Sequence, residues 1–247
     1  MKYKNILTKK YNYVMHIILN RKDKYNVLNN ELTDELIDIL RKSDKSELIK
    51  CIVISGVDDF SAGADINELA INPDFITSWE LIDSIKKPLI AAVDGIAFGG
   101  GNELLLMCDI ILASKEAKFS QPEINLGLIC GGGGTQRLTT KIGKNWAMEM
   151  CLTGNIVTAE EAKNIGLVNH IYDASKLIKH ALDLANEISL KPIEAIISTK
   201  KLIKDASKAH KDGLMAERSK FMQLLKTDNG IEGMNAFKER RKPQFKN

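Results

Sequence analysis

The sequence predicts an α/β fold in which mostly parallel strands alternate with helices. Three apolar runs rich in Ile and Val have the length and the boundaries of buried strands: "CIVISG" ending at Gly56, "PLIAAVDG" ending at Gly95 and "DIILAS" ending at Ser114. Helical patterns lie between and after these runs. Such alternation is typical of an α/β core with mostly parallel pairing.

The N-terminal segment "MKYKNILTKKYNYVMHIILN" is predicted to be a strand. It is basic, but its longest apolar run is short and contains His16, and it has no small-residue cleavage site. These features do not fit a secretory signal peptide.

Four helices are expected from apolar periodicity. In "NNELTDELIDILRK", either Asn29 or Asn30 is suited to be the N-cap, and the apolar positions share one face: Leu32, Leu36, Ile39 and Leu40. The same pattern recurs in "FITSWELIDSI", "TAEEAKNIG" and "KLIKHALDLANEIS". Gly166 is expected to end the third of these helices, because glycine tolerates the left-handed conformation that follows a helix.

The chain after about Lys191 shows only helical patterns, ending in "GIEGMNAFKERRKPQF". We expect an α/β core over residues 1–190 that carries the site. The helical region over residues 191–247 is expected to serve oligomerisation.

The composition is that of an ordinary soluble protein. The 247 residues are 44% hydrophobic and 27% charged, with a net charge of +3 and a pI of about 8.5, which fits neither a disordered chain nor a nucleic-acid binder. No apolar stretch approaches the ~20 residues of a membrane span. The four cysteines form no CxxC pair, so we expect reduced thiols and a cytoplasmic protein: Cys51, Cys108, Cys130 and Cys151.

A carboxylate stands at the start of a very apolar helical run in "FGGGNELLLMCD". Glu103 follows three glycines and precedes Leu104. A buried, unpaired charge is costly. The residue is therefore either a cap that favours the positive end of the helix dipole or a catalytic acid or base.

Two further segments also place glycine and an acid together after a strand. In "FSAGADINEL", Gly63 and Ala64 fall at an expected helix start, where free backbone N–H groups can hold an anion. In "FSQPEINLGLICGGGGTQRL", Pro122 suits a first helical position, Glu123 follows it, and a four-glycine loop spans residues 131–134. Glu123 alone could equally be a first-turn acid stabilised by the dipole.

Familiar glycine, nucleophile and metal motifs do not fit. Gly143-Lys144 is followed by Asn145 instead of the Ser or Thr of a P-loop. A dinucleotide fingerprint would need a third glycine where Leu104 or Gln136 stands, and there is no G-x-S-x-G elbow. The four histidines are scattered singly, so we expect them to be structural or exposed and expect no metal site: His16, His170, His180 and His210.

Taken together, these segments resemble the crotonase family, also called the enoyl-CoA hydratase/isomerase superfamily. The resemblance runs from "LNRKDKYNVLN" through "SAGADI", "KKPLIAAVDGIAFGGGNELLLMCDI", "FSQPEINLGLICGGGGTQRL" and "GNIVTAEEAKNIGLV" to "EGMNAFKERR". It implies a spiral of repeated ββα units followed by a C-terminal helical trimerisation region.

The resemblance also implies roles for individual residues. The backbone N–H groups of Ala64 and Gly100 would form the oxyanion hole, and Glu103 and Glu123 would be the paired catalytic carboxyls. Further substrate or CoA contacts would come from Ala62, Asp65, Ile66 and Gly131, with Lys24 near the nucleotide phosphates, and with Phe237 and Arg240 reaching a neighbouring subunit's CoA. For Lys24 and Arg240, an ordinary solvated side chain is the alternative.

Two positions depart from the family pattern. Asn67 stands where the family often has Lys, which places one phosphate or adenine contact in doubt. Cys130 replaces the usual Pro of the glycine loop. The segment between Ala64 and Pro88 is also shorter than in many hydratases, and we expect Phe75 and Trp79 to close the acyl pocket to long chains.

The implied activity is hydration of a trans-2-enoyl-CoA to a 3-hydroxyacyl-CoA. No cofactor is expected, because coenzyme A is part of the acyl-CoA thioester substrate, and a homo-oligomer, trimer or hexamer, is implied. A Δ3,Δ2-enoyl-CoA isomerase is the nearest rival, but a carboxylate at Glu123 alone can suffice there. Other crotonase-type acyl-CoA enzymes remain possible.

RNA binding is the alternative from another functional class, since some relatives use a lysine-rich helix for it. The segment "STKKLIKDASKAHK" has the period of an ordinary solvated face and no stacking aromatic residue, so no nucleic-acid partner is expected. No membrane partner is expected either, because the sequence has no membrane-spanning stretch. Its basic residues are Lys200, Lys201, Lys204, Lys208 and Lys211.

Overall fold

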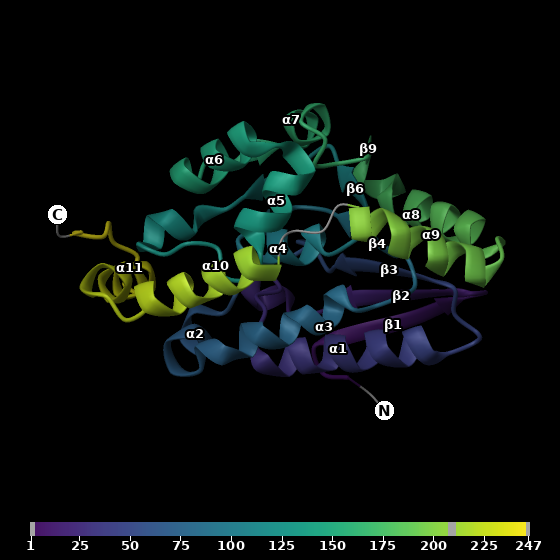
Figure 1. Ribbon diagram of the computed structural model, residues 1–247, viewed down its shortest axis with the longest axis horizontal. Coiled ribbons are helices and arrows are strands. Elements are labelled where there is room, and N and C mark those ends of the chain that lie inside the picture. The colour runs from purple at the N-terminus through teal and green to yellow at the C-terminus, as the bar shows by residue number, and fades with distance from the viewer. Residues whose placement is uncertain (1–2, 207–210, 246–247) are drawn as a thin grey trace.

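Two β-sheets and the helices packed around them make up the computed structural model, which describes residues 3–206 and 211–245 (Figure 1). The large sheet has the strand order β1-β2-β3-β4-β6-β9, and all its neighbours are parallel except β1 and β2. Its strands are β1 (Ile6–Tyr11), β2 (Val14–Leu19), β3 (Cys51–Gly56), β4 (Leu89–Val93), β6 (Ile110–Ser114) and β9 (His170–Tyr172).

The three apolar runs are confirmed as strands β3, β4 and β6. The N-terminal segment differs from the prediction, because it forms an antiparallel hairpin of two strands instead of one. The turn between them passes through Asn12, whose φ is 49°. Asn tolerates this left-handed conformation better than most residues, so the turn could not be read from apolar runs alone.

The two faces of the large sheet are covered by different helices. Cys51 and Val53 of β3 lie on the face covered by α8 (Ala174–Ser189). Ile52 and Ile54 lie on the other face, in the main core that also contains α1 (Asn30–Lys45). This alternation follows from the two-residue period of a strand, and it buries both faces as a parallel sheet requires.

The small sheet stands beside the large one and carries two segments of the site. Its order is β5-β7-β8, with strands at Ile96–Phe98, Lys118–Ser120 and Val157–Thr158. β5 pairs parallel with β7, and Phe98 stands opposite Ser120. The glycines after Phe98 and the turn after Ser120 therefore start from adjacent points.

The predicted helix ends are largely confirmed. Asn29 is the N-cap of α1, where its side chain accepts from the N–H of Leu32. A capping box at Thr158 and Glu161 begins α7 (Ala159–Asn164), and Gly166 lies beyond its end with a φ of 84°. The other core helices are α2 (Ile66–Ile71), α3 (Glu80–Asp83), α4 (Gly100–Leu106), α5 (Gly134–Ile142) and α6 (Lys144–Thr153).

Two helix predictions need correction. The helix expected in "FITSWELIDSI" is a 3₁₀ helix over Pro73–Trp79 followed by the short α3. Within it, the Thr77 and Ser78 hydroxyls donate to carbonyls three residues back, which supports the tighter winding. The helix expected from Gly63 and Ala64 begins only at Ile66, because Ala64 forms an isolated bridge with Leu28 and Asp65 is the N-cap.

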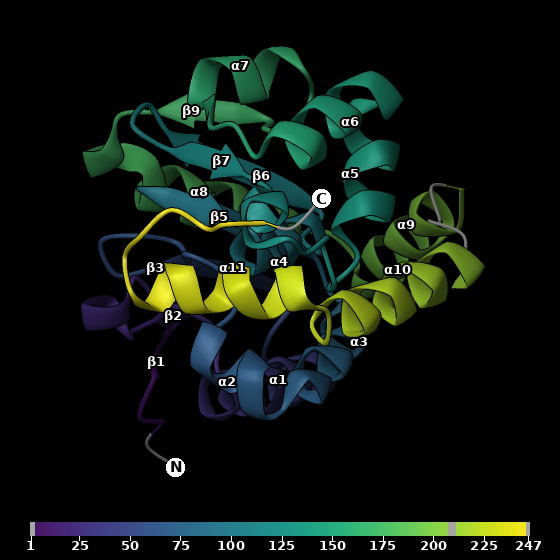
Figure 2. The same cartoon turned by 90° about the vertical axis from the view of Figure 1, so that its left-hand side faces the viewer.

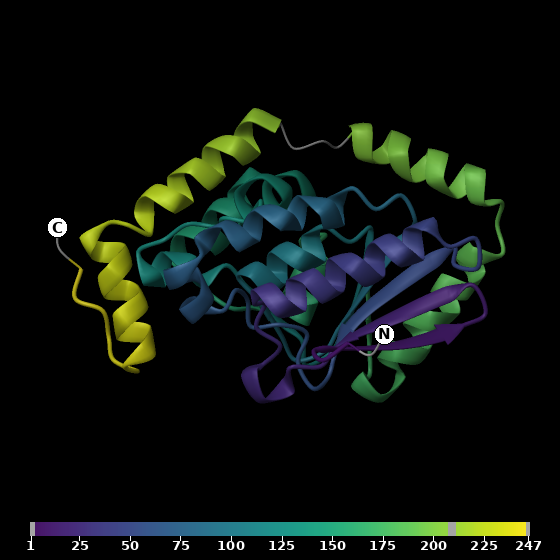
Figure 3. The ribbon, with the colours of Figure 1, turned by 90° about the horizontal axis from the view of Figure 1, so that it is seen from below.

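The C-terminal region is helical, as predicted, and β9 is the last strand in the described part of the chain. It contains α9 (Ile193–Ala206), α10 (Lys211–Leu224) and α11 (Asp228–Lys238). Figures 2 and 3 show α10 and α11 wrapping one end of the molecule, close to α2 and α5. α11 packs on the 3₁₀ helix Pro122–Leu126, where a Cβ at Gly233 would lie 2.2 Å from the Leu126 carbonyl oxygen.

Among the helices described here, none combines the length and the apolar composition that crossing a bilayer requires.

Candidate active site

The chain turns sharply from β5 into α4 at Gly99. Its φ of 49° and ψ of −121° suit glycine, and its N–H donates to the Ser120 carbonyl at 3.0 Å. This turn points the first N–H groups of α4 into a cavity, and it fixes β5 to the strand that leads toward Glu123. A side chain at Gly99 would also lie 3.1 Å from a Glu123 oxygen.

The two N–H groups predicted for the oxyanion hole lie close together. A Cβ at Gly100 would be only 3.1 Å from the Ala64 nitrogen. The Leu28 N–H donates to the Gly63 carbonyl, and the Leu28 carbonyl accepts from the Asp65 N–H. Because these two bonds lie on either side of Ala64, the Ala64 N–H faces away from Leu28. Within residues 3–206 and 211–245, neither the Ala64 nor the Gly100 N–H has a protein acceptor.

Glu103 is buried and held by the glycine loop. Its Oε1 accepts hydrogen bonds of 2.8 Å from the N–H groups of Gly132 and Gly134. Burial raises the pKa of its carboxyl well above the usual value, and the nearby Glu123 and Glu217 carboxyls raise it further. Glu103 is therefore more than a dipole cap, because its partners come from a distant loop.

Glu123 faces Glu103 from the 3₁₀ helix that begins at Pro122. One oxygen of each carboxyl and the Cys130 Sγ all lie within 4.8 Å of one another. Burial raises the pKa of Glu123 to about 8. With its amide oriented to suit its neighbours, Gln121 donates to both Glu123 oxygens at 3.2 Å.

These groups line one cavity of about 70 Å³. Its wall includes most of the predicted site residues: Ala62, Ala64, Ile66, Gly100, Glu103, Glu123 and Gly131. Trp79 also lines it, and a Cβ at Gly100 would lie 2.6 Å from the Trp79 Cη2. Phe75 supports Trp79 by an edge-on contact with ring centroids 6.1 Å apart. Both aromatic residues are buried, and Trp79 alone of the two lines the cavity.

Glu217 is a part of the site that the sequence analysis missed. It is buried on α10, where it accepts from the Gly133 and Thr135 N–H groups at 2.7 Å and from the Thr135 hydroxyl. Burial raises its pKa. Its spacing from Leu214 and Phe221 places it on the same helix face as these apolar residues, which is the one sequence feature that indicates its burial. Glu103, which precedes the glycine loop in the sequence, and Glu217, which follows it, thus both hold the loop.

Other predicted binding residues lie outside this cavity. Asp65 caps α2 and forms an ion pair of 2.9 Å with Arg21. Lys24 is exposed in a 3₁₀ turn, and Phe237 and Arg240 are exposed at the end of α11. The structure therefore brings together the residues predicted to be catalytic and those predicted to form the oxyanion hole, and it places Lys24, Phe237 and Arg240 on the surface.

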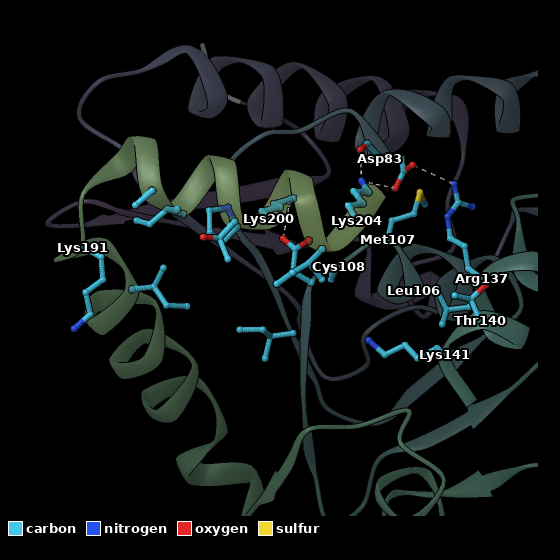
Figure 4. A pocket seen from close by; sticks show the side chains of 18 of the residues that line it. Asp83, Leu106, Met107, Cys108, Arg137, Thr140, Lys141, Lys191, Lys200 and Lys204 are labelled. Atoms are coloured by element: carbon cyan, nitrogen blue, oxygen red, sulfur yellow. Dashed lines mark hydrogen bonds and ion pairs between the residues drawn. The ribbon is translucent and has the colours of Figure 1, made fainter. Parts of the chain in front are cut away.

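A larger cavity of about 700 Å³ lies elsewhere, between α9, α5 and the end of α4 (Figure 4). Two lysines of the basic segment are held there by acids: Lys200 by Asp109 and Lys204 by Asp83, both at 2.7 Å. These two lysines are engaged within the chain, unlike an open cationic surface for RNA. Lys208 falls outside the described residues, as does the side chain of Lys211.

The histidines are not at the site. His16 is buried and shares a 2.8 Å hydrogen bond with the Ser55 hydroxyl, and burial lowers its pKa to about 4. His180 stacks on Tyr172, with ring centroids 3.9 Å apart, and His170 is a tilted neighbour of the same ring. His210 lies outside the described residues. The one group of described side chains arranged to hold a metal ion is Glu103, Glu123 and Cys130.

Comparisons with known proteins agree with this geometry. The sequence model of the family described as "Enoyl-CoA hydratase/isomerase" matches residues 9–247. A "Probable enoyl-CoA hydratase" of Rhizobium meliloti is 40% identical, with 100% of this chain and 99% of the relative covered. The mitochondrial enoyl-CoA hydratase of Pongo abelii is 42% identical, with 96% and 85% covered.

A solved structure shows the same fold. The enoyl-CoA hydratase/isomerase from Pseudoalteromonas atlantica T6c superposes with a TM-score of 0.90 at 29% identity, and 98% of this chain and 100% of that one are covered. The overall fold is thus that of a solved structure of this family. The chain belongs to the enoyl-CoA hydratase/isomerase family.

Proposed function

We propose that the protein is an enoyl-CoA hydratase, which adds water across the double bond of a trans-2-enoyl-CoA to give a 3-hydroxyacyl-CoA. One observation carries this proposal. Two carboxyls, Glu103 and Glu123, approach within 4.8 Å in a cavity whose wall also holds the free N–H groups of Ala64 and Gly100. The names of the full-length relatives support it.

The N–H groups of Ala64 and Gly100 would polarise the thioester carbonyl by hydrogen-bonding to its oxygen. Hydration moves charge onto the thioester oxygen, and the donors of Ala64 and Gly100 are already fixed where that charge would develop. Because they need no reorganisation, the loss of one such donor typically costs ~3–4 kcal/mol of transition-state stabilisation.

The carboxyl pair supplies the proton transfers. A water that accepts or donates bonds of about 2.8 Å on each side can bridge oxygens less than 5 Å apart. One carboxylate takes a proton as the water attacks the β-carbon, and a proton is delivered to the α-carbon on the same side. The raised pKa values keep one proton on the pair near neutral pH, because two close buried carboxyls resist ionising together.

Coenzyme A enters as part of the substrate, and we propose no separate cofactor. Lys24 is exposed and could contact the nucleotide phosphates, whereas Asn67 cannot supply the charge of the lysine it replaces. We further propose a homotrimer, or a hexamer built from two trimers, in which residues 191–247 make subunit contacts and Phe237 and Arg240 approach a neighbour's CoA. A cytoplasmic location fits the four free cysteines.

The test is an assay on crotonyl-CoA and longer trans-2-enoyl-CoAs. We expect loss of the enoyl-thioester absorbance and appearance of the 3-hydroxyacyl-CoA, with oxygen from labelled water in the product. A protein that only moves the double bond of a 3-enoyl-CoA, without incorporating water, would be an isomerase and would contradict the proposal.

A further inference from the structure

Two of the four cysteines meet beside the catalytic carboxyls. Cys130 lies just before the glycine loop and Cys151 lies in the last turn of α6, and their Sγ atoms are 3.9 Å apart. Cys51 and Cys108 instead face the backbone carbonyls of Pro88 and Leu104. All four cysteines are free thiols in the structure. Because only Cys130 and Cys151 contact each other through sulfur, they are the pair placed to form a disulfide.

A disulfide between these two residues requires a small approach. A disulfide has S–S ≈ 2.05 Å, so the sulfurs must close by about 2 Å. Cys151 is fixed in a helix, whereas Cys130 precedes four consecutive glycines, Gly131 to Gly134. The loop side is therefore the part that moves, since a proline in place of Cys130 would have restricted its backbone.

The movement would reach Glu103 through one short contact. A Cβ at Gly134 would lie 2.7 Å from the Cys130 Cβ and 2.8 Å from its Sγ, so the cysteine side chain rests against the backbone of Gly134. The Gly134 N–H is one of the two donors that hold Glu103 Oε1. Movement of Cys130 toward α6 would displace the Gly134 N–H and weaken its hydrogen bond to the Glu103 carboxyl.

We propose that Cys130 and Cys151 form an oxidation site, in which hydrogen peroxide converts the two thiols to a disulfide that reversibly lowers turnover. The effect on turnover rests on the proposed hydratase function, whereas bond formation does not. Cys151 is only partly buried and so the more accessible of the two. This accessibility favours Cys151 as the thiol that peroxide reaches first.

The chemistry balances in two steps. The Cys151 thiolate attacks one peroxide oxygen, the O–O bond breaks, and the released hydroxide takes a proton to become water, leaving a sulfenic acid. The Cys130 sulfur then attacks the Cys151 sulfur, the S–O bond breaks, and the second hydroxide leaves with the Cys130 proton as water. Peroxide is reduced and the two thiols are oxidised by two electrons.

The experiment treats the full-length protein with hydrogen peroxide and then with dithiothreitol. We expect the intact mass to fall by two hydrogen atoms, thiol titration to show two fewer thiols, and a peptide map to join Cys130 to Cys151. Hydration kcat should fall by about tenfold and return on reduction.

Matched variants separate the pair from the other thiols. Cys151→Ala should keep the basal activity and resist peroxide, while Cys51→Ala, which removes a thiol in β3, should respond like the parent. A disulfide between subunits, over-oxidation without a linked peptide, or a Cys130–Cys151 bond that leaves kcat unchanged would each overturn the proposal. If the reduced protein shows no hydratase activity, the mass and thiol measurements still decide whether the bond forms.

Discussion

Glu103 and Glu123 differ in how they are held, yet both are expected to be indispensable. Glu103→Gln and Glu123→Gln should each lower hydration kcat by about 10²–10⁴-fold, because the amide keeps the side-chain volume but cannot exchange the proton. Steady-state kinetics on crotonyl-CoA, with thermal unfolding as the control for folding, measure this. Near-parental turnover in either variant would contradict the two-carboxyl mechanism.

The raised pKa values of the pair predict how the rate responds to alkali. Hydration needs one carboxyl protonated and the other ionised, so the pair must hold one proton. Since burial raises the pKa of Glu123 to about 8, kcat/KM should decline as pH rises through this region. A pH profile of kcat/KM measures it. An activity that stays level to pH 10 would show that the pair needs no proton.

His16 predicts a different pH effect, on stability instead of rate. Burial lowers its pKa from 6.5 to about 4, so the unfolded chain binds the proton more tightly than the folded one. Its contribution is present above pH 6.5 and is lost as pH falls toward 4, by up to about 3 kcal/mol. Urea unfolding of the parent and of His16→Gln, compared at pH 7 and pH 4.5, should show the stability gap between them shrinking in acid.

At the residue scale the sequence was most informative where a motif fixes the backbone. The glycines before Glu103 and the proline before Glu123 predicted their local turns, and the family resemblance implied their catalytic roles. The contacts of Glu217 could not be predicted, because they join it to the backbone N–H groups of Gly133 and Thr135 and to the Thr135 hydroxyl, about 80 residues away along the chain. The helix face that Glu217 shares with Leu214 and Phe221 suggests burial but does not identify such distant partners.

Among the elements, the 3₁₀ helix Pro73–Trp79 has the most direct consequence for substrate choice. Trp79 lines the cavity at Gly100, and we expect the acyl chain to meet its ring there. We expect kcat/KM to fall steeply beyond short to medium acyl chains. Trp79→Ala should shift the optimum to longer chains, since each methylene that then fits adds up to ~0.8 kcal/mol.

A matched change in the same segment controls for loss of packing. Phe75 is buried and contacts the Trp79 ring edge-on without lining the cavity, so Phe75→Leu should reduce stability with a smaller change in chain-length preference. The measurement is kcat/KM from four-carbon to sixteen-carbon enoyl-CoAs. A parental kcat/KM that keeps rising with length would show that the short segment opens the pocket.

The predictions of helices and strands were confirmed where burial of apolar residues alone determines the local structure. Buried strands β3, β4 and β6 are continuous apolar runs, and α1 has a clear apolar face and a cap. The predictions were wrong where local bonding competes with periodicity, as in the 3₁₀ winding at Thr77 and Ser78. They were also wrong at Ala64, because its bridge to Leu28 is a contact with a distant segment.

On the scale of the whole molecule, the exposed side of α11 predicts self-association. Ile231 and Phe237 are 46% and 60% exposed, whereas Met234 packs into the core of its own chain. Apolar residues presented in this way mark contact surfaces. Light scattering should report a trimer or a hexamer. Phe237→Asp should shift the protein toward smaller species, because it places a charge on this exposed apolar side of α11. A stable, active monomer would refute this prediction.

The strand order of the large sheet also bears on how the enzyme is made. Each strand from β2 to β9 pairs with one that the ribosome has already produced, so the sheet can grow at one edge during translation. The Glu217 carboxyl, which fixes Gly133 and Thr135, emerges only after every strand. A nascent chain can thus complete the sheet before Glu217 fixes the glycine loop, so the site is finished only after α10 has been made.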